Sequence, residues 1–372
     1  MANSFDDLIP KLIAGAMPII RTHAVLPRLV TRDYQGMAAQ KGSTIDVPIT
    51  PTMTSRDVTP GPTPPANQDT TEGVVSITLD KWRECTFHMT DKELAELADG
   101  QYPKKAAAAA ATLADYVDTQ LFTCISEGAG IALGTAGTDP FASLALAQEV
   151  NTELNQRSAL KTGRHCVFNA LAEANLIALD TFANSDFVGD VTAMTEGAFN
   201  ENGRRLGANW WQDENAPTHT KGTGASFLVN GALAEGATTI TADGGSGTIL
   251  AGDVVTFAAD TDNKYVVTEA LSGGSFKIGG VGLRVAIPDN NAITVNNNHT
   301  VNVAFHTDAV ALVTRELQTD GGNPDVMSMT DPMTGLTIRL ERLRGWRQTT
   351  YAFDVLFGCK VVESKHAIKV MG

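Results

Sequence analysis

The residues that could carry out chemistry are few, and they stand far apart in the chain. The most suggestive are the adjacent His165 and Cys166, with His306 much later. A cysteine with a histidine beside it is a combination that nucleophilic catalysis uses. Adjacent residues in a strand point to opposite faces, however, so His165 and Cys166 would not act together. We expect no catalytic role for them, and an enzyme with a lid-like insert is the weakest of three hypotheses about function.

Known motifs for nucleotides and metal ions are missing from the sequence. There is no GxSxG nucleophile elbow, HExxH motif or P-loop. The glycines within 128–134 follow a helical pattern rather than a strand, so they do not match the dinucleotide fingerprint. The stretch from Asp260 starts like a calcium loop, but Tyr265 and Leu271 occupy the positions of its central glycine and closing glutamate. We interpret it as a hairpin turn and predict no catalytic, cofactor-binding or metal-binding residues and no cofactor.

A basic strip surrounds Trp346, and Glu341 lies within it. Its arginines could contact DNA phosphates, but such strips are more often solvated or salt-bridged faces. We favour ion pairing between subunits over contact with DNA. The arginines are Arg339, Arg342, Arg344 and Arg347.

Two adjacent tryptophans, Trp210 and Trp211, precede a segment rich in β-strand patterns. They motivate the second hypothesis, in which the chain is a glycan-binding or adhesion module whose β-rich segment holds the glycan.

Composition sets broad bounds on the fold and the function. The 372 residues suffice for two or three structural units. The formal net charge of −14 argues against a protein whose main task is to grip nucleic acid, although it is compatible with enclosing DNA. The four cysteines form no CxxC pair, which favours reduced thiols over a disulfide framework or a zinc site. No signal peptide and no membrane span are expected from the hydrophobic pattern.

The longest element that the sequence predicts is a helix over 103–128. Pro103 suits a first helical turn, an alanine run follows, and Gly128 and Gly130 mark the end. An apolar stripe with a spacing of four residues runs along it, and we expect the polar residues between to face away. The stripe is Leu113, Val117, Leu121 and Ile125, and the polar residues are Asp115, Asp118, Thr119 and Ser126.

The first 30 residues contain a one-sided helical pattern that begins at Phe5. Pro10 and Pro18 are expected to keep this helix short or kinked. Two alternatives stay open: a helix folded onto its own domain, or an arm that docks on a neighbouring subunit.

Residues 35–81 contain no aromatic side chain, and six prolines lie among them. Strand patterns at 44–49 and 74–79 predict a long two-stranded excursion with a proline-rich tip. Because this stretch cannot build a core, we expect it to borrow one from another chain. The alternative is a flexible surface loop.

The rest of the chain mixes helical and strand patterns on both sides of a β-rich segment. A capping box at Thr90–Glu93 opens a short helix to Leu97. Further helices are predicted at 141–160 and 170–182, and strands at 164–169, within 187–218, and at 301–305, 309–314, 337–343, 349–356, 360–362 and 367–370.

Helix signals vanish between 222 and 298, where short β-rich runs alternate with turn residues. The spacing predicts a small closed barrel of about 75 residues. Because mixed α/β patterns resume afterwards, the barrel is expected to be an insertion. The runs are 226–229, 238–242, 253–258, 264–269, 275–278, 284–287 and 292–295.

The order of these parts resembles the major capsid proteins of tailed bacteriophages with the HK97 fold. The resemblance is closer to the P22-like coat proteins, which carry an inserted barrel, although the insertion here is shorter. It extends over nearly the whole chain and depends on the order of the parts rather than on one motif. The stretches that carry it are KGSTIDVPIT (41–50), the helices within 90–128, GRRLGANWWQDENAPTHT (203–220), GTILAGDVVTFA (247–258), NVAFHTDAVALVTREL (302–317), GLTIRLERLRGWR and YAFDVLFGCKVV.

The resemblance implies an α+β fold of the HK97 type, divided along the chain into parts with their own names. These are an N-terminal arm (1–35), an extended E-loop (36–88), a peripheral domain (89–163 and 334–356) with its spine helix (103–128), an axial domain (164–221, 299–333 and 357–372) and the inserted all-β barrel (222–298).

The resemblance also implies a function, that of a structural coat protein rather than an enzyme. Such subunits form the hexamers and pentamers of an icosahedral shell, the virion head that encloses the double-stranded DNA of a tailed phage. Assembly takes place in the bacterial cytoplasm, and the implied partners are further copies of the chain, a scaffolding protein, a portal and a decoration protein. The DNA is enclosed without sequence-specific binding, and no membrane is involved. An arm and an excursion without a core become reasonable if neighbouring subunits bury them.

Overall fold

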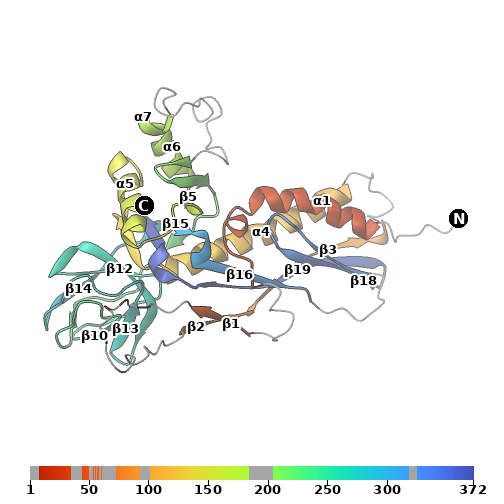
Figure 1. Ribbon diagram of the computed structural model, residues 1–372. Coiled ribbons are helices and arrows are strands. Elements are labelled where there is room, and N and C mark those ends of the chain that lie inside the picture. Colours follow the sequence, from red (N-terminus) through yellow and green to blue (C-terminus); the bar gives the residue numbers. More distant parts are fainter. Residues whose placement is uncertain are drawn as a thin grey trace.

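One long helix, α4 (Gln101–Gly128), runs through the body of the molecule, and the other elements are arranged around it (Figure 1). Its 28 residues span roughly 42 Å. The helix α1 (Leu8–His23) and a five-stranded sheet flank α4 at one end, and a β-barrel lies at the other. The computed structural model describes residues 8–34, 44–49, 53, 55, 57, 60, 73–92, 101–183, 204–317 and 325–372.

The helix predicted at 103–128 is confirmed, and its apolar stripe is buried. The polar side, however, is not uniformly exposed: Asp118 and Ser126 are buried. That prediction was wrong because α4 packs against neighbours on several sides, including α1 and strands of both sheets. The Asp118 carboxylate accepts hydrogen bonds from the backbone N–H groups of Val25 (3.2 Å) and Leu26 (2.9 Å), so it fixes the turn that follows α1.

The helix α1 folds onto α4 of its own chain, which decides between the two alternatives for this segment. Its prolines do not make it short, since it has 16 residues with Pro18 inside. An interior proline costs about 3 kcal/mol, whereas each large apolar side chain that becomes buried contributes about 1.5–3 kcal/mol. The buried face of α1 is Leu12, Ile13, Ala16, Met17 and Ile20.

The five-stranded sheet is built on β19, which pairs antiparallel with three of its four other strands. The sequence predicted two strands here, at 349–356 and 360–362, and this was wrong because Gly358 does not interrupt the pairing. A Cβ atom at Gly358 would lie 2.1 Å from the Thr78 carbonyl oxygen, so glycine lets β19 pass close to another segment. Two strands, β3 and β17, were not predicted. The strands are β3 (Lys81–Thr90), β16 (Val310–Arg315), β17 (Val326–Thr330), β18 (Thr337–Gly345) and β19 (Gln348–Val361).

A second sheet crosses the barrel end of α4, in the strand order β4-β20-β15-β5-β7-β6, with β8 also paired to β15. The helices α5 and α6 pack on it, and both are shorter than predicted. Ser143 precedes α5 in an extended conformation, and the second predicted helix is divided into α6 and α7. The elements are β4 (Ile131–Gly134), α5 (Leu144–Gln156), β5 (Arg164–Phe168), α6 (Ala170–Ile177), α7 (Asp180–Ala183), β6 (Arg204–Arg205), β7 (Ala208–Gln212), β8 (Thr218–His219), β15 (His299–His306) and β20 (Ala367–Met371).

The predicted barrel is present and closed. Its six strands follow the order β11-β14-β9-β10-β13-β12, and pairing of β11 with β12 completes the ring. The chain leaves β8 and returns in β15, which pair through His219 and His299, so the barrel is an insertion. The predicted run 284–287 is not a strand, because Arg284 turns out of the barrel toward Glu153 on α5. The strands are β9 (Phe227–Val229), β10 (Thr239–Asp243), β11 (Val254–Phe257), β12 (Asp260–Ser272), β13 (Ser275–Ile278) and β14 (Ala292–Val295).

The two-stranded excursion is confirmed as an antiparallel ribbon of β1 (Thr44–Ile49) and β2 (Gly73–Thr78). The expectation that it borrows its core from another chain is wrong for these strands. Their inner side chains, with Leu79, pack on β16 of the same chain, so the ribbon lies against its own body. Sequence reasoning could not foresee this contact because β16 is distant in the chain. The inner side chains are Ile45, Val47 and Ile77, which meet Ala311 and Val313.

Some sequence predictions fall outside the described residues. These are most of the proline-rich tip, the short helix to Leu97 and the part of 187–218 before position 204. The named domain boundaries that the resemblance implies stay a prediction.

Candidate functional site

The structure keeps His165 and Cys166 apart, as the strand pattern predicted. Both lie on β5, where Cys166 faces the buried side of the sheet. The indole N–H of Trp211 lies 3.2 Å from His165 Nδ1. Burial, with a smaller effect of His306, lowers the pKa of His165 to about 4, and burial raises the pKa of Cys166. A neutral histidine and a buried thiol on opposite faces form no nucleophile pair.

His306 has a structural role at the end of β15. Its Nε2 lies 2.8 Å from the Thr162 carbonyl oxygen, and its Nδ1 accepts a hydrogen bond from the Asp308 backbone N–H at 3.2 Å. Both ring nitrogens are therefore engaged in holding loops together.

The calcium-like stretch belongs to the β11–β12 hairpin, but the prediction of a turn from Asp260 was wrong, because Asp260 already begins strand β12 and the turn lies at positions 258 and 259. Phe257 pairs with Asp260 across a tight turn. The Asp260 carboxylate is buried and accepts hydrogen bonds from the side chains of Asn263 (2.7 Å) and Tyr265 (2.6 Å). Its oxygens thus stabilise the barrel. In the described residues, no three His, Cys, Asp or Glu side chains gather in a way that could hold a metal ion.

The two tryptophans do not form a sugar-binding platform. Trp210 is buried in a cluster of aromatic rings, and its N–H donates to the Arg205 carbonyl at 2.9 Å. Trp211 is half-buried between His165 and the Arg28 guanidinium. The glycan-binding hypothesis thereby loses the observation that motivated it. The rings around Trp210 belong to Phe141, Phe168 and Phe182.

The basic strip around Trp346 is paired mainly within its own chain, in contrast to the expected pairing between subunits. Arg339 Nε donates to Asp354 at 3.0 Å, and Arg342 lies 3.4 Å from Asp325. Arg344 pairs with Asp91 at 2.5 and 2.7 Å, and Arg347 stacks on Trp346. Three arginines are thus neutralised by aspartates that stand far from them in the sequence or across a strand pair, which composition alone cannot reveal.

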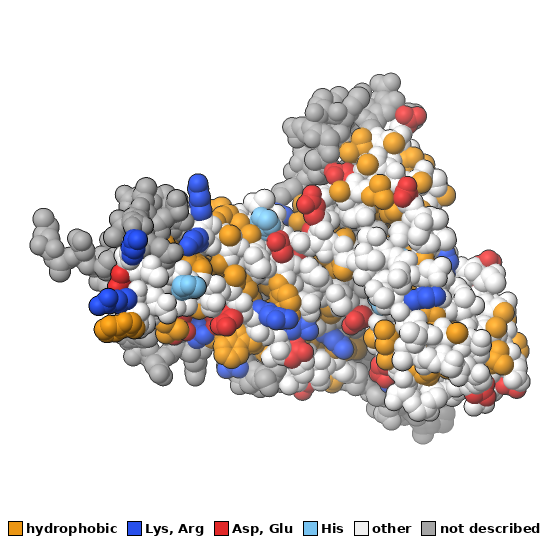
Figure 2. All heavy atoms as spheres, turned by 180° about the vertical axis from the view of Figure 1, so that it is seen from behind, with side chains coloured by type: hydrophobic (Ala, Val, Ile, Leu, Met, Phe, Trp, Pro, Cys, Tyr) orange, Lys and Arg blue, Asp and Glu red, His pale blue; other side chains and the backbone are white. Residues whose placement is uncertain are grey.

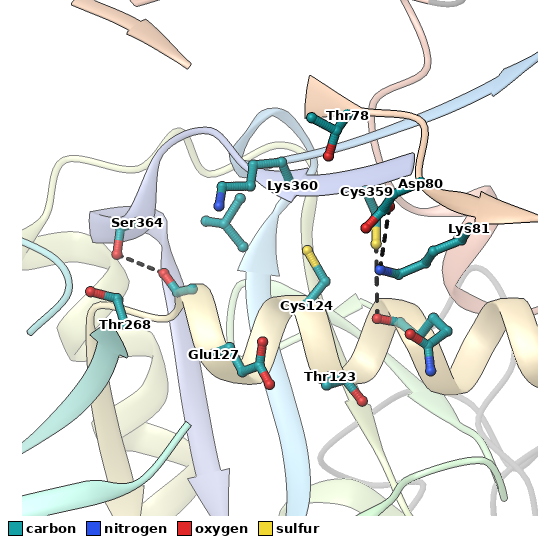
Figure 3. A pocket seen from close by; sticks show the side chains of 13 residues that line it. Thr78, Asp80, Lys81, Thr123, Cys124, Glu127, Thr268, Cys359, Lys360 and Ser364 are labelled. Carbon is teal, nitrogen blue, oxygen red and sulfur yellow. Dashed lines mark hydrogen bonds and ion pairs between the residues drawn. The ribbon is translucent and has the colours of Figure 1, made fainter. Parts of the chain in front are cut away.

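The structure instead brings together a pocket that no sequence motif indicated (Figure 3). It has a volume of about 540 Å³ and lies where α4, β19, the end of the ribbon and the barrel meet. Cys124 comes from α4 and Cys359 from β19, while Asp80 and Lys81 follow the ribbon. The signal available in the sequence was only that 124 and 359 are cysteines in apolar surroundings.

Lys81 and the two cysteines of this pocket shift one another's pKa values. Burial would lower the pKa of Lys81, but Cys359 and Asp80 outweigh it and raise that pKa. The adjoining Cys124 sulfur lowers the pKa of Cys359 against the effect of burial, and Lys81 lowers it further. Contact with Cys359 and burial raise the pKa of Cys124. Within this pocket, the pKa of Cys359 is therefore lowered and that of Cys124 is raised.

The surface of the five-stranded sheet carries large exposed apolar side chains. Trp346 is 85% exposed, Trp82 61% and Leu343 51%. Among the described strands, β3 pairs only with β19, so it forms an edge of the described sheet. Figure 2 shows hydrophobic side chains scattered over one face, with Lys and Arg at the end opposite the barrel and along the middle of the face. An edge strand beside exposed aromatic rings is typical of a surface that pairs with another chain.

Solved structures show which fold this is. The structure from Mycobacterium phage Che8 matches with a TM-score of 0.54 at 16% identity, covering 94% of this chain and 91% of that chain. The capsid structure of cyanophage P-SCSP1u matches with a TM-score of 0.50 at 11% identity, covering 94% and 86%. This is an HK97-type capsid fold. The fold that the sequence resemblance implied is thus confirmed, whereas the closer likeness to the P22-like branch stays a prediction.

Two further comparisons add no relatives. No protein-family model matches the sequence, and the comparison with curated proteins finds no match. Within the described residues, no helix combines the length and the apolar character that crossing a membrane requires.

Proposed function

We propose that this chain is the coat protein of a tailed phage, and that copies of it assemble into the icosahedral shell that encloses the double-stranded DNA. The observation that carries the proposal is the fold, which 94% of the chain shares with the capsid structure of cyanophage P-SCSP1u. A structural subunit of this kind needs no catalytic centre. Its function depends on surfaces that fit other copies of itself.

The position of β3 at the edge of the described sheet supports this proposal. Among the residues that the structure describes, this strand pairs with β19 alone, and an edge strand is a template for pairing with another chain. Trp82 on this strand and Trp346 at the β18–β19 turn add apolar area that a neighbouring subunit would bury. We propose that this end of the molecule makes a contact between subunits.

The charge of the chain supports enclosure of DNA rather than tight binding. The net charge is −14, and three arginines of the strip around Trp346 are paired with aspartates. Few counterions would be released on contact with DNA, so binding at physiological salt would be weak. The packaged genome could then be arranged inside the shell without adhering to its wall.

The finer parts of the proposal follow the resemblance. We propose hexamers and pentamers as the assembly units, with a scaffolding protein, a portal and a decoration protein as partners. The mature location is the virion, after assembly in the host cytoplasm. The division into arm, E-loop, peripheral domain, axial domain and inserted barrel is proposed with the boundaries given above.

The test is to express the full chain in bacteria and to examine it by electron microscopy and light scattering over a hundred-fold range of concentration. We expect closed shells, rings or tubes that form above a threshold concentration, also when a crowding polymer replaces the scaffold. A chain that stays monomeric throughout, while circular dichroism shows the folded state, would contradict the proposal.

Variants at Trp346 separate assembly from folding. Trp346→Ser should raise the threshold concentration at least several-fold without changing the melting temperature, because this ring is exposed in the single chain. Trp346→Phe keeps an apolar ring and should assemble nearly as the parent does. Equal thresholds for all three proteins would remove this end of the molecule from the proposed contact.

A further inference from the structure

Two cysteines that are distant in the sequence face each other across the pocket of Figure 3. Cys359 Sγ lies 3.9 Å from the carbonyl oxygen of Gln120, one turn before Cys124 on α4. Helical side chains lean toward the N-terminus of their helix, so the Cys124 side chain covers that same turn. In Figure 3 the Cys124 side chain points from α4 toward β19, and the Cys359 side chain points from β19 toward α4. Both are half-buried free thiols that line the pocket.

The backbone on both sides of this pair is held in close contact. A Cβ atom at Gly128 would lie 2.5 Å from a Val361 methyl carbon, so the end of α4 lies directly against β19. Ser364 donates to the Gly128 carbonyl at 2.6 Å, which fixes the same junction. On the other side, Gly358 lies against the Thr78 carbonyl. The end of α4 is therefore fixed against β19 on one side of the pair, and β19 is held against the ribbon on the other.

Lys81 adds a cation to the pocket that both cysteines line, and it lowers the pKa of Cys359. Its ammonium group lies 3.6 Å from Asp80 and lines the same pocket as Cys359. A cation beside a thiol favours the thiolate, which is the form that attacks a disulfide. Cys359 is thus the attacking group, and Cys124, which lies next to it, is placed to resolve the product.

We propose that Cys124 and Cys359 form a redox site, in which a small disulfide such as glutathione disulfide converts the two thiols reversibly into an intramolecular disulfide. The inference does not depend on the proposed function. The Cys359 thiolate attacks one sulfur of the oxidant, a new S–S bond forms, and the first glutathione leaves as its thiolate. That thiolate takes the proton of Cys124, whose sulfur then attacks the Cys359 sulfur and breaks its bond to the second glutathione. The second glutathione also leaves as a thiolate and takes up the proton that Cys359 had released. The protein loses two electrons and two protons, and one glutathione disulfide becomes two glutathiones.

The other cysteines are poor competitors for the oxidant. Cys166 is fully buried, and burial raises its pKa. Cys85 lies on β3 with a pKa that burial also raises, and it is not part of the pocket lining. The geometry therefore predicts oxidation of a specific pair rather than general oxidation of the protein.

The bridge would connect two parts of the molecule beside a third. It would join α4 to β19 beside Thr78, the last residue of the ribbon strand β2. Oxidation would then restrain the end of the ribbon at Thr78 relative to α4, and a reductant would remove this restraint.

The experiment uses the full chain, reduced, freed of reductant and incubated with glutathione disulfide near pH 8. The intact mass should fall by two hydrogen atoms, and a non-reducing peptide map should link the peptides that contain positions 124 and 359. Dithiothreitol should restore the original mass. Cys85→Ser is the matched control and should react as the parent does.

Variants identify each step. Cys124→Ser should stop at the mixed disulfide and gain the mass of one glutathione on Cys359. Cys359→Ser should react at least ten-fold more slowly, and Lys81→Met should slow alkylation of Cys359 at neutral pH. A parent protein that stops at the mixed disulfide, or that oxidises first at Cys85, would overturn the proposal, as would a Cys359→Ser protein that reacts at the parental rate.

Discussion

At the level of single residues, Lys369 has the most unusual environment. Its side chain is fully buried at the junction of β20 with the barrel, and its ammonium donates to the Gly252 carbonyl at 2.7 Å. Burial lowers its pKa from 10.5 to about 7, although the carboxylates of Asp253 and Glu127 act in the opposite direction. Burial in turn raises the pKa of Glu127. A lysine that gives up its proton near neutral pH makes the stability of this junction depend on pH.

The sign of this dependence follows from where the proton is bound. Between about pH 7 and 10.5 the unfolded chain binds a proton at Lys369 that the folded chain has lost. The free energy of unfolding should therefore rise with pH across this window, by up to roughly 5 kcal/mol for a shift of this size. Below about pH 7, Lys369 is protonated in the folded chain as well, and the free-energy cost of burying its charge is fully present.

Lys369→Met tests this prediction because it removes the titrating group and keeps the length of the side chain. Urea unfolding at several pH values, followed by tryptophan fluorescence, should show a rise in stability for the parent that the variant lacks. Parallel pH profiles for the two proteins would contradict it. Lys277→Met, at an exposed site in the barrel, should keep the parental profile.

At the level of elements, α1 illustrates how tertiary contacts maintain a helix that its sequence weakens. Pro18 lies inside the helix, yet the buried face packs against the alanine-rich side of α4. The Asp118 carboxylate then accepts hydrogen bonds from backbone N–H groups of the turn that follows α1. The helix depends on α4 more than on its own propensity.

Neighbouring isoleucines in α1 allow a matched test. Ile20→Ala should lower the free energy of unfolding by about 2–5 kcal/mol, because Ile20 is buried against α4. Ile19→Ala should have a clearly smaller effect, because Ile19 is only half-buried. Urea midpoints of the unassembled chain measure both, and equal losses would contradict the packing described here.

At the level of the whole molecule, the inserted barrel is coupled to the body through several contacts. Strand β12 pairs with β4, and Gly280 lies against Gly130 in close backbone contact. The Arg284 guanidinium meets the Glu153 carboxylate on α5, with one contact of 3.0 Å, and both side chains are largely buried. The barrel is therefore expected to unfold together with the body.

Arg284→Met should weaken this coupling, because it leaves Glu153 buried without its partner at a cost of about 3–5 kcal/mol. Calorimetry should show a lower melting temperature or a separate transition of the barrel. The double variant with Glu153→Gln should recover part of the loss. Lys277→Met breaks the exposed pair with Glu269, which is worth at most about 1 kcal/mol. If Lys277→Met and Arg284→Met changed the melting transition equally, the barrel would not be coupled to the body through Arg284.

The sequence by itself determined the elements whose pattern is local. The spacing of Leu113, Val117 and Leu121 predicted the long helix, and alternation with turn residues predicted the closed barrel and the ribbon strands. The order of these parts indicated the capsid fold, and the strand pattern correctly separated His165 from Cys166. These inferences succeed because helix and strand periodicities are written in neighbouring residues.

Only the tertiary structure decided which elements meet. It placed the ribbon on β16, paired the arginines around Trp346 with distant aspartates, and brought Cys124 on α4 and Cys359 on β19 into one pocket. It also buried Asp118, which a one-stripe helix pattern had placed in solvent. Such contacts join positions far apart in the chain, and their free energy depends on burial and geometry that no local pattern contains.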